Sequence, residues 1–455
     1  MENTLNEVNL EEMLAAREQR VAKQQKLLNI YKQALICFTM NIPGPIKVNH
    51  LVKSGFETGC YHLEKILSTA NYPVLAQEKT WEKTGLEAYY VIGKDSLAVK
   101  KLMVELESQD ALGRLFDIDV LKPDGSKVSR EELGLPGRLC LLCDKPAQEC
   151  ARSRTHTVAD LMKHVQQVLE DSLLDTVAQC CRQALQAEAD ATPKPGLVDR
   201  DNPGAHKDMN HDTFNKSIVA ITPYFRQMAK VGLHWEGDGQ ALFKAIRPLG
   251  SAAEKAMFQA TCNVNTHKGI ISSLGLMVTF ALWYYREKGT FAPEAIMELC
   301  GKETKDILNQ DFANIDKAHP KTHGEKLYVQ HGFTGIRGEA MAGFPAVRNI
   351  GLPAIKEFSK QGQDAEKVHI QTLLTLLENV EDSNILIRTN AEMLKYARAQ
   401  AKNILSLGGA FTDAGLNAIW NLNEDFIQKN LSPGGTADLL ISTIFWQRLT
   451  TIYNA

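Results

Sequence analysis

The first 160 residues combine two periodicities of apolar and polar positions. Residues 9–37 are predicted as a helix with an approximate apolar stripe, formed by Leu10, Met13, Leu14, Val21, Leu27 and Leu28. A strand-like run follows at Ala34–Met40 and enters a stiff turn with two prolines around Gly44. The remaining predicted elements are a helix over Gly59–Ala70 and strands near Pro73–Thr80 and Ala88–Gly93. This mixture is typical of an α+β domain.

The pattern becomes helical near residue 160 and stays helical to the end of the chain. From Val158 onward we find no convincing set of strands, which predicts a larger, all-α second domain. Its longest uncharged apolar run, Ile270–Tyr285, is short for a bilayer span and contains two serines and a threonine, so we expect a buried core helix. We therefore predict a first domain over residues 1–171 and a second over 172–455, joined within continuous helical sequence.

The second domain repeats one arrangement, a polar loop, usually with glycine, that leads into an apolar helix. The first loop, Pro193–Met209, contains three prolines and two glycines, so it cannot form a continuous helix. Four further loops of this kind follow, at residues 263–269, 331–340, 381–388 and 431–440. A polar, rigid loop between helices is a common place for a binding or catalytic site.

These loops bring charged side chains to the starts of helices, where free N–H groups and the helix dipole favour phosphate. The cations are Lys194, Arg200, Lys268, Arg337 and Arg388, and the carboxylates are Asp199, Asp208, Glu339, Asp382 and Asp438. Any single loop could be a solvated helix cap. Five in one helical domain predict a phosphorylated ligand held together with a metal ion.

In the first domain, the segment Phe116–Val120 alternates apolar and acidic residues with the period of a half-buried strand. Asp117 and Asp119 therefore share one face and lie close enough to hold a divalent cation such as Mg²⁺, which phosphoryl transfer requires. The alternative is an exposed strand face, although aspartate is a poor strand former. Glu105 and Glu107 are candidates for a third carboxylate.

Basic side chains near the start of the chain are candidates for contact with a phosphate. Arg17, Arg20 and Gln24 share one face of the first predicted helix, and Lys47 ends the stiff proline turn. Until an anion is placed near them, a solvated helix face is the alternative.

Cys140, Cys143, Cys150 and His156 form an array that could bind zinc, because tetrahedral Zn²⁺ accepts three thiolates and one imidazole. The separation of the second and third ligands is shorter than in the usual zinc finger. The alternative is a buried strand carrying small sulfur side chains, and the short spacing favours it.

Composition excludes several functional classes. A net charge of −3 and a pI near 6.5 give no electrostatic footprint for nucleic acid or an anionic membrane. The acidic N-terminus lacks the apolar core of a signal peptide, and nine cysteines are an odd number for a full disulfide set. We therefore expect a cytoplasmic protein with reduced thiols.

Two families share these motifs. Residues from about 172 onward resemble triphosphoribosyl-dephospho-coenzyme A synthase, through the segments Pro193–Arg200, Gly204–Met209, Asn265–Gly269, Gly335–Ala340 and Leu431–Asp438. The N-terminal part resembles apo-citrate lyase phosphoribosyl-dephospho-coenzyme A transferase, also called holo-citrate lyase synthase, through Arg17, Arg20, Gln24, the turn 43–47, the segment 113–120 and the Cys/His array. One departure is Arg388-Thr-Asn390, where the synthase family has glycines after the arginine.

The resemblance implies a bifunctional transferase with a nucleotidyltransferase-like first domain. Its substrates would be ATP and 3′-dephospho-coenzyme A, its protein partner the acyl carrier (gamma) subunit of citrate lyase, and its cofactor Mg²⁺. The implied catalytic residues are Asp117, Asp119, Asp199, Asp208, Glu339, Asp382 and Asp438, with Asp117, Asp119, Asp208 and Asp438 on the metal. The implied substrate-binding residues are Arg17, Arg20, Lys47, Arg114, Lys194, Arg200, His206, Asn265, His267, Lys268, Arg337, Arg388, Ser432, Gly434 and Gly435.

Two alternatives to this function stay open at the level of sequence. One is the equivalent prosthetic-group pathway of malonate decarboxylase, which differs in its carrier protein. The other is a non-enzymatic protein that binds a nucleotide or docks a carrier, although a pure phosphate binder has no need for so many carboxylates.

Overall fold

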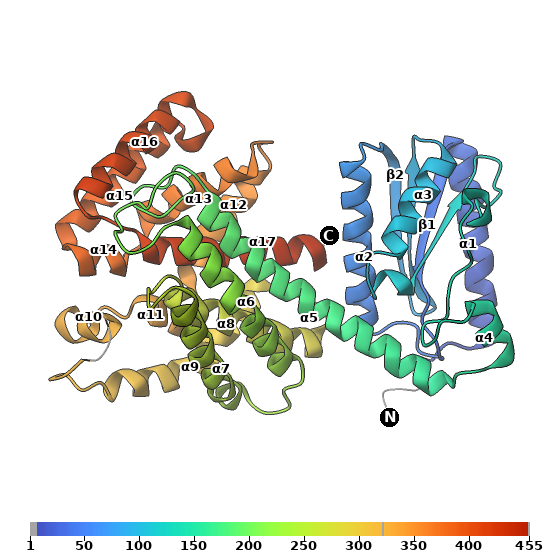
Figure 1. Cartoon of the computed structure of the whole chain (residues 1–455), viewed down its shortest axis with the longest axis horizontal. Helices are drawn as coiled ribbons and strands as arrows, with labels where there is room; N and C mark the ends of the chain where they lie inside the picture. Colours follow the sequence, from blue (N-terminus) through green and yellow to red (C-terminus); the bar gives the residue numbers. More distant parts are fainter. Residues whose placement is uncertain (1–6, 321–322, 454–455) are drawn as a thin grey trace. The chain divides into compact units, whose positions relative to one another are not determined.

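The computed structural model describes residues 7–320 and 323–453, and the chain divides into two compact units (Figure 1). Unit 1 extends to Leu173 and unit 2 begins at Leu174, beside the domain boundary that we predict at residues 171 and 172. The boundary falls inside one helix, α5 (Val158–Asp190). The acidic start of the chain, residues 1–6, lies outside the described residues.

Unit 1 is a four-stranded sheet with helices on both faces. The sheet has the order β2-β3-β1-β4, and every neighbouring pair is antiparallel. Its elements are α1 (Leu10–Tyr31), β1 (Ala34–Met40), α2 (His50–Thr69), β2 (Val74–Glu82), β3 (Gly85–Ile92), α3 (Ser96–Glu107), η2 (Gly113–Leu115), β4 (Phe116–Leu121), η3 (Glu131–Leu133) and α4 (Ala147–Ser153).

The main core of unit 1 lies between the sheet and α2, α3 and the start of α5. Ile36, Phe38, Phe56, Phe116 and Ile118 are at most 1% exposed in this core. A smaller apolar cluster on the opposite face joins Leu27 and Leu28 of α1 to the sheet. Figure 1 shows α1 and α2 on opposite sides of the sheet. Because side chains alternate along a strand, residues between the core positions of β4 point toward α1.

The first helix is shorter than predicted. It ends at Tyr31, because Lys32 adopts a left-handed conformation (φ 50°), and the buried strand β1 follows at Ala34. The predicted apolar stripe is also only partly correct. Leu27 and Leu28 are buried, whereas Leu10, Leu14 and Val21 are exposed by 74%, 48% and 50%.

The second helix starts earlier than predicted, at His50, where the Asn49 side chain caps the helix by accepting the Val52 N–H. Gly55 and Gly59 lie inside it, which weakens the helical pattern in the sequence. Both glycines allow close packing, because an added Cβ would lie 2.5 Å from Leu169 Cδ2 at Gly55 and 2.5 Å from Phe38 Cζ at Gly59.

All described secondary structure of unit 2 is helical, which confirms a mixed α/β first domain followed by an all-α second domain. Beyond α5 its elements are α6 (His211–Leu233), α7 (Gly239–Ala260), α8 (Lys268–Lys288), α9 (Pro293–Ala313), α10 (His323–His331), α11 (Gly335–Met341), η4 (Val347–Gly351), α12 (Leu352–Ser359), α13 (Ala365–Asn379), α14 (Ser383–Arg388), α15 (Ala391–Ser406), η5 (Gly409–Phe411), α16 (Asp413–Gln428) and α17 (Gly434–Tyr453).

Helix α8 contains the apolar run 270–285 and is buried over most of its length, as predicted. Helices α6, α7, α9 and α17 pack around it. In the described part of the chain, no helix combines the length and apolar character needed to cross a membrane.

Candidate active sites

The five polar loops of unit 2 meet one another, although they span about half of the sequence. His206 of the first loop contacts Ser432 of the last, with 2.8 Å between Nε2 and Oγ. Arg388 donates to the carbonyl of Ala205 at 2.6 Å. Asp382 accepts from the N–H of Thr436 at 2.6 Å.

The other two loops join this group through glycines. An added Cβ at Gly269 would lie 2.1 Å from Asp438 Oδ2, and one at Gly335 would lie 3.4 Å from Ser383 Oγ. At residue 269 the chain therefore passes directly against the carboxylate of Asp438, and a larger side chain there would displace that carboxylate. The fold therefore brings together the five loops that the sequence singles out.

A buried ion pair lies at the base of the first loop. Lys194 is 0% exposed, and its Nζ donates to Glu188 Oε1 at 2.5 Å and to the Glu188 carbonyl. Glu188 Oε2 is buried and has no hydrogen-bond partner among the described residues. Sequence reasoning missed Glu188, because it lies in the last turns of a long helix, where glutamate is ordinary. The positive charge of Lys194 is therefore neutralised by Glu188 within the protein.

Asp438 lies close to this pair. Burial raises the pKa of Asp438 well above its usual value, and the nearby carboxylates of Glu188 and Asp382 raise it further. Within the described part of the chain, no hydrogen bond reaches its carboxylate. Glu188 and Asp438 thus form a pair of carboxyl groups that have unused capacity to bind a ligand.

Two histidines beside these groups are uncharged at neutral pH. Burial and the charge of Lys194 lower the pKa of His267 to about 3, and burial and Arg388 lower the pKa of His206 to about 4. His267 Nδ1 lies 2.6 Å from Ser217 Oγ, and its buried Nε2 has no partner among the described residues. Both imidazoles are therefore neutral hydrogen-bonding groups.

Asp382 and Asp199 hold the backbone of their loops. Asp382 accepts from the N–H groups of Asn384, Ile385 and Thr436 and from the Thr436 hydroxyl. Asp199 accepts from the N–H groups of Lys194, Asp201 and Asn202. The sequence predicts both as catalytic residues, and in the structure their oxygens accept these bonds and hold the loops in place. Gly434 and Gly435 lie beside the Asp382 loop, at Asn384 and Asp382.

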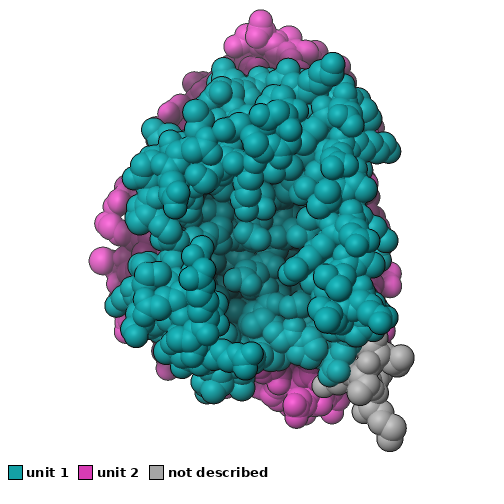
Figure 2. Space-filling model, turned by 90° about the vertical axis from the view of Figure 1, so that its right-hand side faces the viewer, with its two compact units in different colours: residues 1–173, 455 teal, residues 174–454 magenta. Residues whose placement is uncertain are grey.

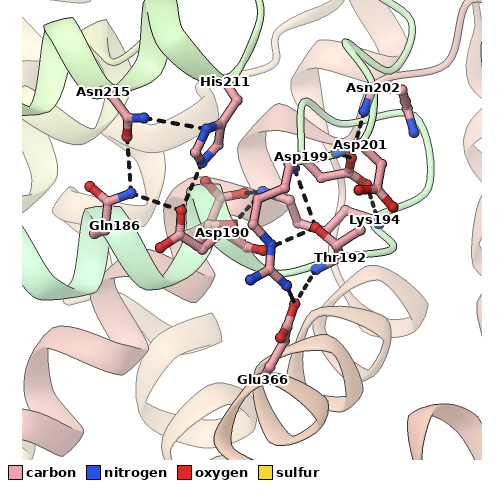
Figure 3. Close-up of polar contacts among 12 residues, drawn as sticks. Gln186, Asp190, Thr192, Lys194, Asp199, Asp201, Asn202, His211, Asn215 and Glu366 are labelled. Atoms are coloured by element: carbon pink, nitrogen blue, oxygen red, sulfur yellow. Dashed lines mark hydrogen bonds and ion pairs between the residues drawn. The ribbon is translucent and has the colours of Figure 1, made fainter.

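Several predicted substrate-binding residues of the loops already have partners within the protein. Arg200 pairs with Glu366, which also accepts from Thr192 N–H (Figure 3). Figure 3 also shows Asp190, at the end of α5, bound by Gln186 and His211. Lys268 pairs with Glu254 at 2.9 Å, and Asn265 accepts from Lys268 N–H at 3.3 Å.

Three more residues that we predict as catalytic or substrate-binding, Asp208, Glu339 and Arg337, each lie in a different environment. Asp208 is largely exposed, 4.0 Å from His206 Nδ1. Glu339 accepts the Ala346 N–H, and burial raises its pKa. Arg337 lies over the ring of Phe312, 5.9 Å from its centroid.

In unit 1, Asp117 and Asp119 project from the same face of β4, while Phe116, Ile118 and Val120 are buried on the other. This confirms the predicted alternation. The neighbouring residues on β1 are Thr39 beside Asp117 and Cys37 beside Asp119. Asp119 also pairs with Lys127, whose side chain is more than half exposed.

The predicted basic residues lie on the same side of the sheet as these carboxylates. Gln24 donates to Cys37 Sγ at 3.3 Å, and Arg20 pairs with Glu87 of β3 at 2.6 Å. Lys47 donates to the Ile42 carbonyl at 2.7 Å, and burial and the charge of Arg17 lower its pKa. The surface of unit 1 on the α1 side is hollowed (Figure 2).

Glu107 is not available as a third metal ligand. Its side chain is 2% exposed, pairs with Arg130 and Arg138, and accepts the Ile118 N–H at the outer edge of β4. Glu105 is exposed on α3. Arg114, which we had expected to bind substrate, donates to the carbonyls of Leu139 and Cys140.

The Cys/His array lies on a loop and on α4, so the interpretation as a buried strand is wrong. The reason is local: Cys140 N–H donates to the Lys145 carbonyl, which folds the chain back on itself. The four side chains converge.

Comparison with known proteins matches both units to families. Residues 174–455 match the family of ATP:dephospho-CoA triphosphoribosyl transferase, and residues 8–172 match that of apo-citrate lyase phosphoribosyl-dephospho-CoA transferase. The "Protein CitXG" of Leuconostoc mesenteroides subsp. cremoris is 35% identical over 97% of this chain and 97% of its own length. The "Protein CitXG" of Haemophilus influenzae is 34% identical over 97% of this chain and 96% of its own length.

A further relative matches about two thirds of this chain. The 2-(5''-triphosphoribosyl)-3'-dephosphocoenzyme-A synthase of Haemophilus ducreyi is 37% identical over 68% of this chain and 99% of its own length. The chain therefore belongs to the CitXG family, in which the transferase family of unit 1 and the triphosphoribosyl transferase family of unit 2 are fused in one polypeptide.

Proposed function

We propose that this protein makes the prosthetic group of citrate lyase in unit 2 and attaches it to the acyl carrier subunit in unit 1. The observation that carries the first half is the meeting of the five loops beside the buried groups Glu188, Lys194 and Asp438. The observation that carries the second half is the pair Asp117 and Asp119 beside α1.

In unit 2, a ribose hydroxyl of 3′-dephospho-coenzyme A attacks the anomeric carbon of the ATP ribose. The bond to adenine breaks, and the proton of the hydroxyl ends on the adenine. Such a displacement passes through an oxocarbenium-like state that a nearby carboxylate stabilises. Glu188 is the carboxylate that we place there. Asp438, whose raised pKa favours the protonated form, is suited to pass a proton to the leaving base.

The charges of the groups around Lys194 and Asp438 support a requirement for a divalent cation. Glu188 neutralises the buried ammonium group of Lys194, the carboxylate of Asp382 lies near Asp438, and both histidines are neutral, so these groups carry no net positive charge. A triphosphate would be repelled by such a site unless a cation accompanied it. Mg²⁺ would supply charge neutralisation of the triphosphate, and the largely exposed carboxylate of Asp208, beside His206, would help to hold it.

Arg388 and His206 are the groups that we expect to contact the phosphates. Arg388 is half-buried where the first, fourth and fifth loops meet, next to His206 and Ser432. The starts of α14 and α17 lie beside them, and Asp382 links the two by accepting the N–H groups of Asn384, Ile385 and Thr436.

In unit 1, we infer nucleotidyltransferase-like chemistry. A serine hydroxyl of the carrier attacks the α-phosphorus of the triphosphoribosyl group, the bond to the β-phosphate oxygen breaks, and pyrophosphate leaves together with the proton of the hydroxyl. Asp117 and Asp119 would hold Mg²⁺, which neutralises charge on the transferred group. Arg17 and Lys47 lie on the same side of the sheet, where they can contact phosphate oxygens.

Two readouts on the full-length protein test both halves. Adenine release from ATP and dephospho-coenzyme A reports unit 2, and mass spectrometry of the carrier reports unit 1. Asp438→Asn and Glu188→Gln should each lower adenine release at least on the order of a hundredfold, which corresponds to about 2.7 kcal/mol. Asp117→Asn and Asp119→Asn should leave adenine release intact and stop attachment, so that the intermediate accumulates.

A matched control uses Lys127→Gln, which removes the ion partner of Asp119 and leaves both carboxylates in place. Attachment at a near-normal rate in both aspartate variants would show that β4 is only a solvated face. Near-normal adenine release in folded Asp438→Asn and Glu188→Gln would place the unit 2 site elsewhere.

Two further points are the identity of the carrier protein and the location of the enzyme in the cell. Acyl carrier subunits of citrate lyase and of malonate decarboxylase, offered in equal amounts, would show which one is modified. The reduced cysteines support a cytoplasmic location for both reactions.

A further inference from the structure

Three cysteines and one histidine of unit 1 bring their side chains to one point. The ligand atoms of Cys140, Cys143, Cys150 and His156 all lie within 4.8 Å of one another. Cys143 Sγ is 3.4 Å from Cys150 Sγ and 3.2 Å from His156 Nε2, and all three cysteines are free thiols. The residues come from a loop, from α4 and from the segment after α4, so the fold itself assembles the cluster.

These distances match the spacing of ligands around one tetrahedral metal ion. Bond lengths of about 2.3 Å for Zn–S and about 2.0–2.1 Å for Zn–N imply about 3.8 Å between two sulfurs and about 3.6 Å between sulfur and nitrogen. Three thiolates with one imidazole are soft donors that select zinc over Mg²⁺ or Ca²⁺. The Leu142 N–H lies 3.5 Å from Cys140 Sγ, where it can donate to that sulfur as a metal-bound thiolate.

The segment that carries the cluster has almost no apolar core. From residue 129 to residue 164, all of which the structure describes, Cys150 is the one buried residue. Ordering a backbone costs about 1–2 kcal/mol per residue, and little apolar burial is available here to offset it. Small segments in this position are commonly held by a metal, whose binding energy stabilises the fold.

The segment is also tied to the candidate active strand. Arg114, two residues before β4, donates to the carbonyls of Leu139 and Cys140. Arg138 donates to the Phe116 carbonyl and pairs with Glu107. The position of residues 138–140 therefore bears directly on the strand that presents Asp117 and Asp119.

We propose that Cys140, Cys143, Cys150 and His156 bind one Zn²⁺ with all four positions filled by protein, and that this ion fixes the segment 134–156 beside β4. A closed set of four ligands leaves no position for water or substrate, so the role is structural. Because unit 1 would bear the loss, adenine release by unit 2 should not depend on this ion.

The first experiment measures zinc in the full-length protein. After purification in metal-free buffer with one equivalent of Zn²⁺ and gel filtration, elemental analysis should find about one zinc per chain. The double variant Cys143→Ser, Cys150→Ser should lose it, whereas Cys262→Ser, which changes an exposed cysteine outside the cluster, should keep it. Full zinc retention in the double variant would overturn the proposal.

The second experiment needs no variant to fold. Metal-free wild-type protein with reduced thiols is titrated with Co²⁺, and tetrahedral thiolate ligation should give intense visible d–d bands and a near-ultraviolet sulfur-to-cobalt band that saturate at one equivalent. Chelation should open the 134–156 segment to limited proteolysis while adenine release continues. A protein without these bands, or one isolated with a Cys143–Cys150 disulfide and no metal, would refute the site. Neither readout depends on the proposed reactions, so failure of the zinc site and failure of the proposed function are distinguishable.

Discussion

At the scale of single residues, burial decides what each charged side chain can do. Lys194 and Arg200 lie six positions apart in one loop and look equally suited to phosphate in the sequence. Lys194 is fully buried and neutralises Glu188, whereas Arg200 is half exposed and pairs with Glu366. Neither cation is left to meet a triphosphate directly. Arg388, at the meeting point of three loops, is the remaining candidate among the three.

We therefore expect Arg388 and Arg200 to respond differently to the same change. Arg388→Gln should lower adenine release about tenfold to a hundredfold, because it removes the guanidinium charge at the point where the first, fourth and fifth loops meet. Arg200→Gln should stay within about threefold, because an exposed ion pair contributes about 0–1 kcal/mol. Steady-state adenine release at saturating ATP measures both. Equal losses in the two variants would show that Arg200 reaches the substrate after all.

A buried histidine gives unit 2 a defined sensitivity to acid. Burial and nearby Arg448 lower the pKa of His369 to about 4, so the folded protein keeps it neutral while the unfolded chain takes up a proton near pH 6.5. The stability from His369 is complete above about pH 6.5 and is lost as the pH falls toward about 4, up to roughly 3 kcal/mol. His369→Gln should flatten this fall in denaturation midpoints. The exposed His319→Gln is the control, and identical slopes would contradict the assignment.

At the scale of secondary structure, side chains close the open edge of the sheet. The Ile118 N–H donates to Glu107 and the Ile118 carbonyl accepts from buried Lys100, while Arg138 donates to the Phe116 carbonyl. The outer edge of β4 is thereby satisfied without a fifth strand. The strand that carries Asp117 and Asp119 is held on its outer side by an ionic network.

Glu107→Gln should lower the free energy of unfolding of unit 1 by about 3–5 kcal/mol, because it leaves two arginines beside a buried site without their carboxylate. Glu105→Gln, two positions away and exposed, should change it by no more than about 0.5 kcal/mol. Urea denaturation followed in the full-length protein compares the two. If the Glu107→Gln protein were as stable as the Glu105→Gln protein but unable to modify the carrier, Glu107 would be a metal ligand after all.

Elements with a periodic pattern of apolar residues could be predicted from the sequence. Elements and residues that depend on contacts between distant parts of the chain could not. Alternation in Phe116–Val120 was enough to place both aspartates on one face. Gly55 and Gly59 concealed the first half of α2, because the reason for them is contact with Leu169 and Phe38, which a local pattern does not contain. Glu188 was missed for the same reason: its partner Lys194 lies in the next loop, and its neighbour Asp438 is at the far end of the chain.

At the scale of the whole molecule, α5 belongs to both units, and its second half is bound within unit 2. Arg226 of α6 donates to Asp175 at 2.5 Å, and Arg448 of α17 donates to Gln183 at 3.0 Å. These contacts, and a relative that consists of the synthase alone, indicate that unit 2 needs little of unit 1.

We predict that residues 172–455, expressed alone, fold and release adenine from ATP when dephospho-coenzyme A is added. The turnover should lie within about tenfold of the full-length protein, and Asp438→Asn in the fragment should abolish it. Circular dichroism establishes that the fragment is folded. A folded fragment without activity, beside an active full-length chain, would mean that the two reactions share a site.

The distance along the chain between Glu188 and Asp438, 250 positions (438 − 188), has a consequence for the order of synthesis. Domains fold as the ribosome produces them, with the N-terminal one first. Unit 1 has all its residues before α17, with Asp438, has been translated. A message cut short anywhere between residue 174 and α17 would thus yield a chain that keeps Asp117 and Asp119 but lacks Asp438. Such truncation would leave an enzyme able to attach the prosthetic group but unable to make it, and never the reverse.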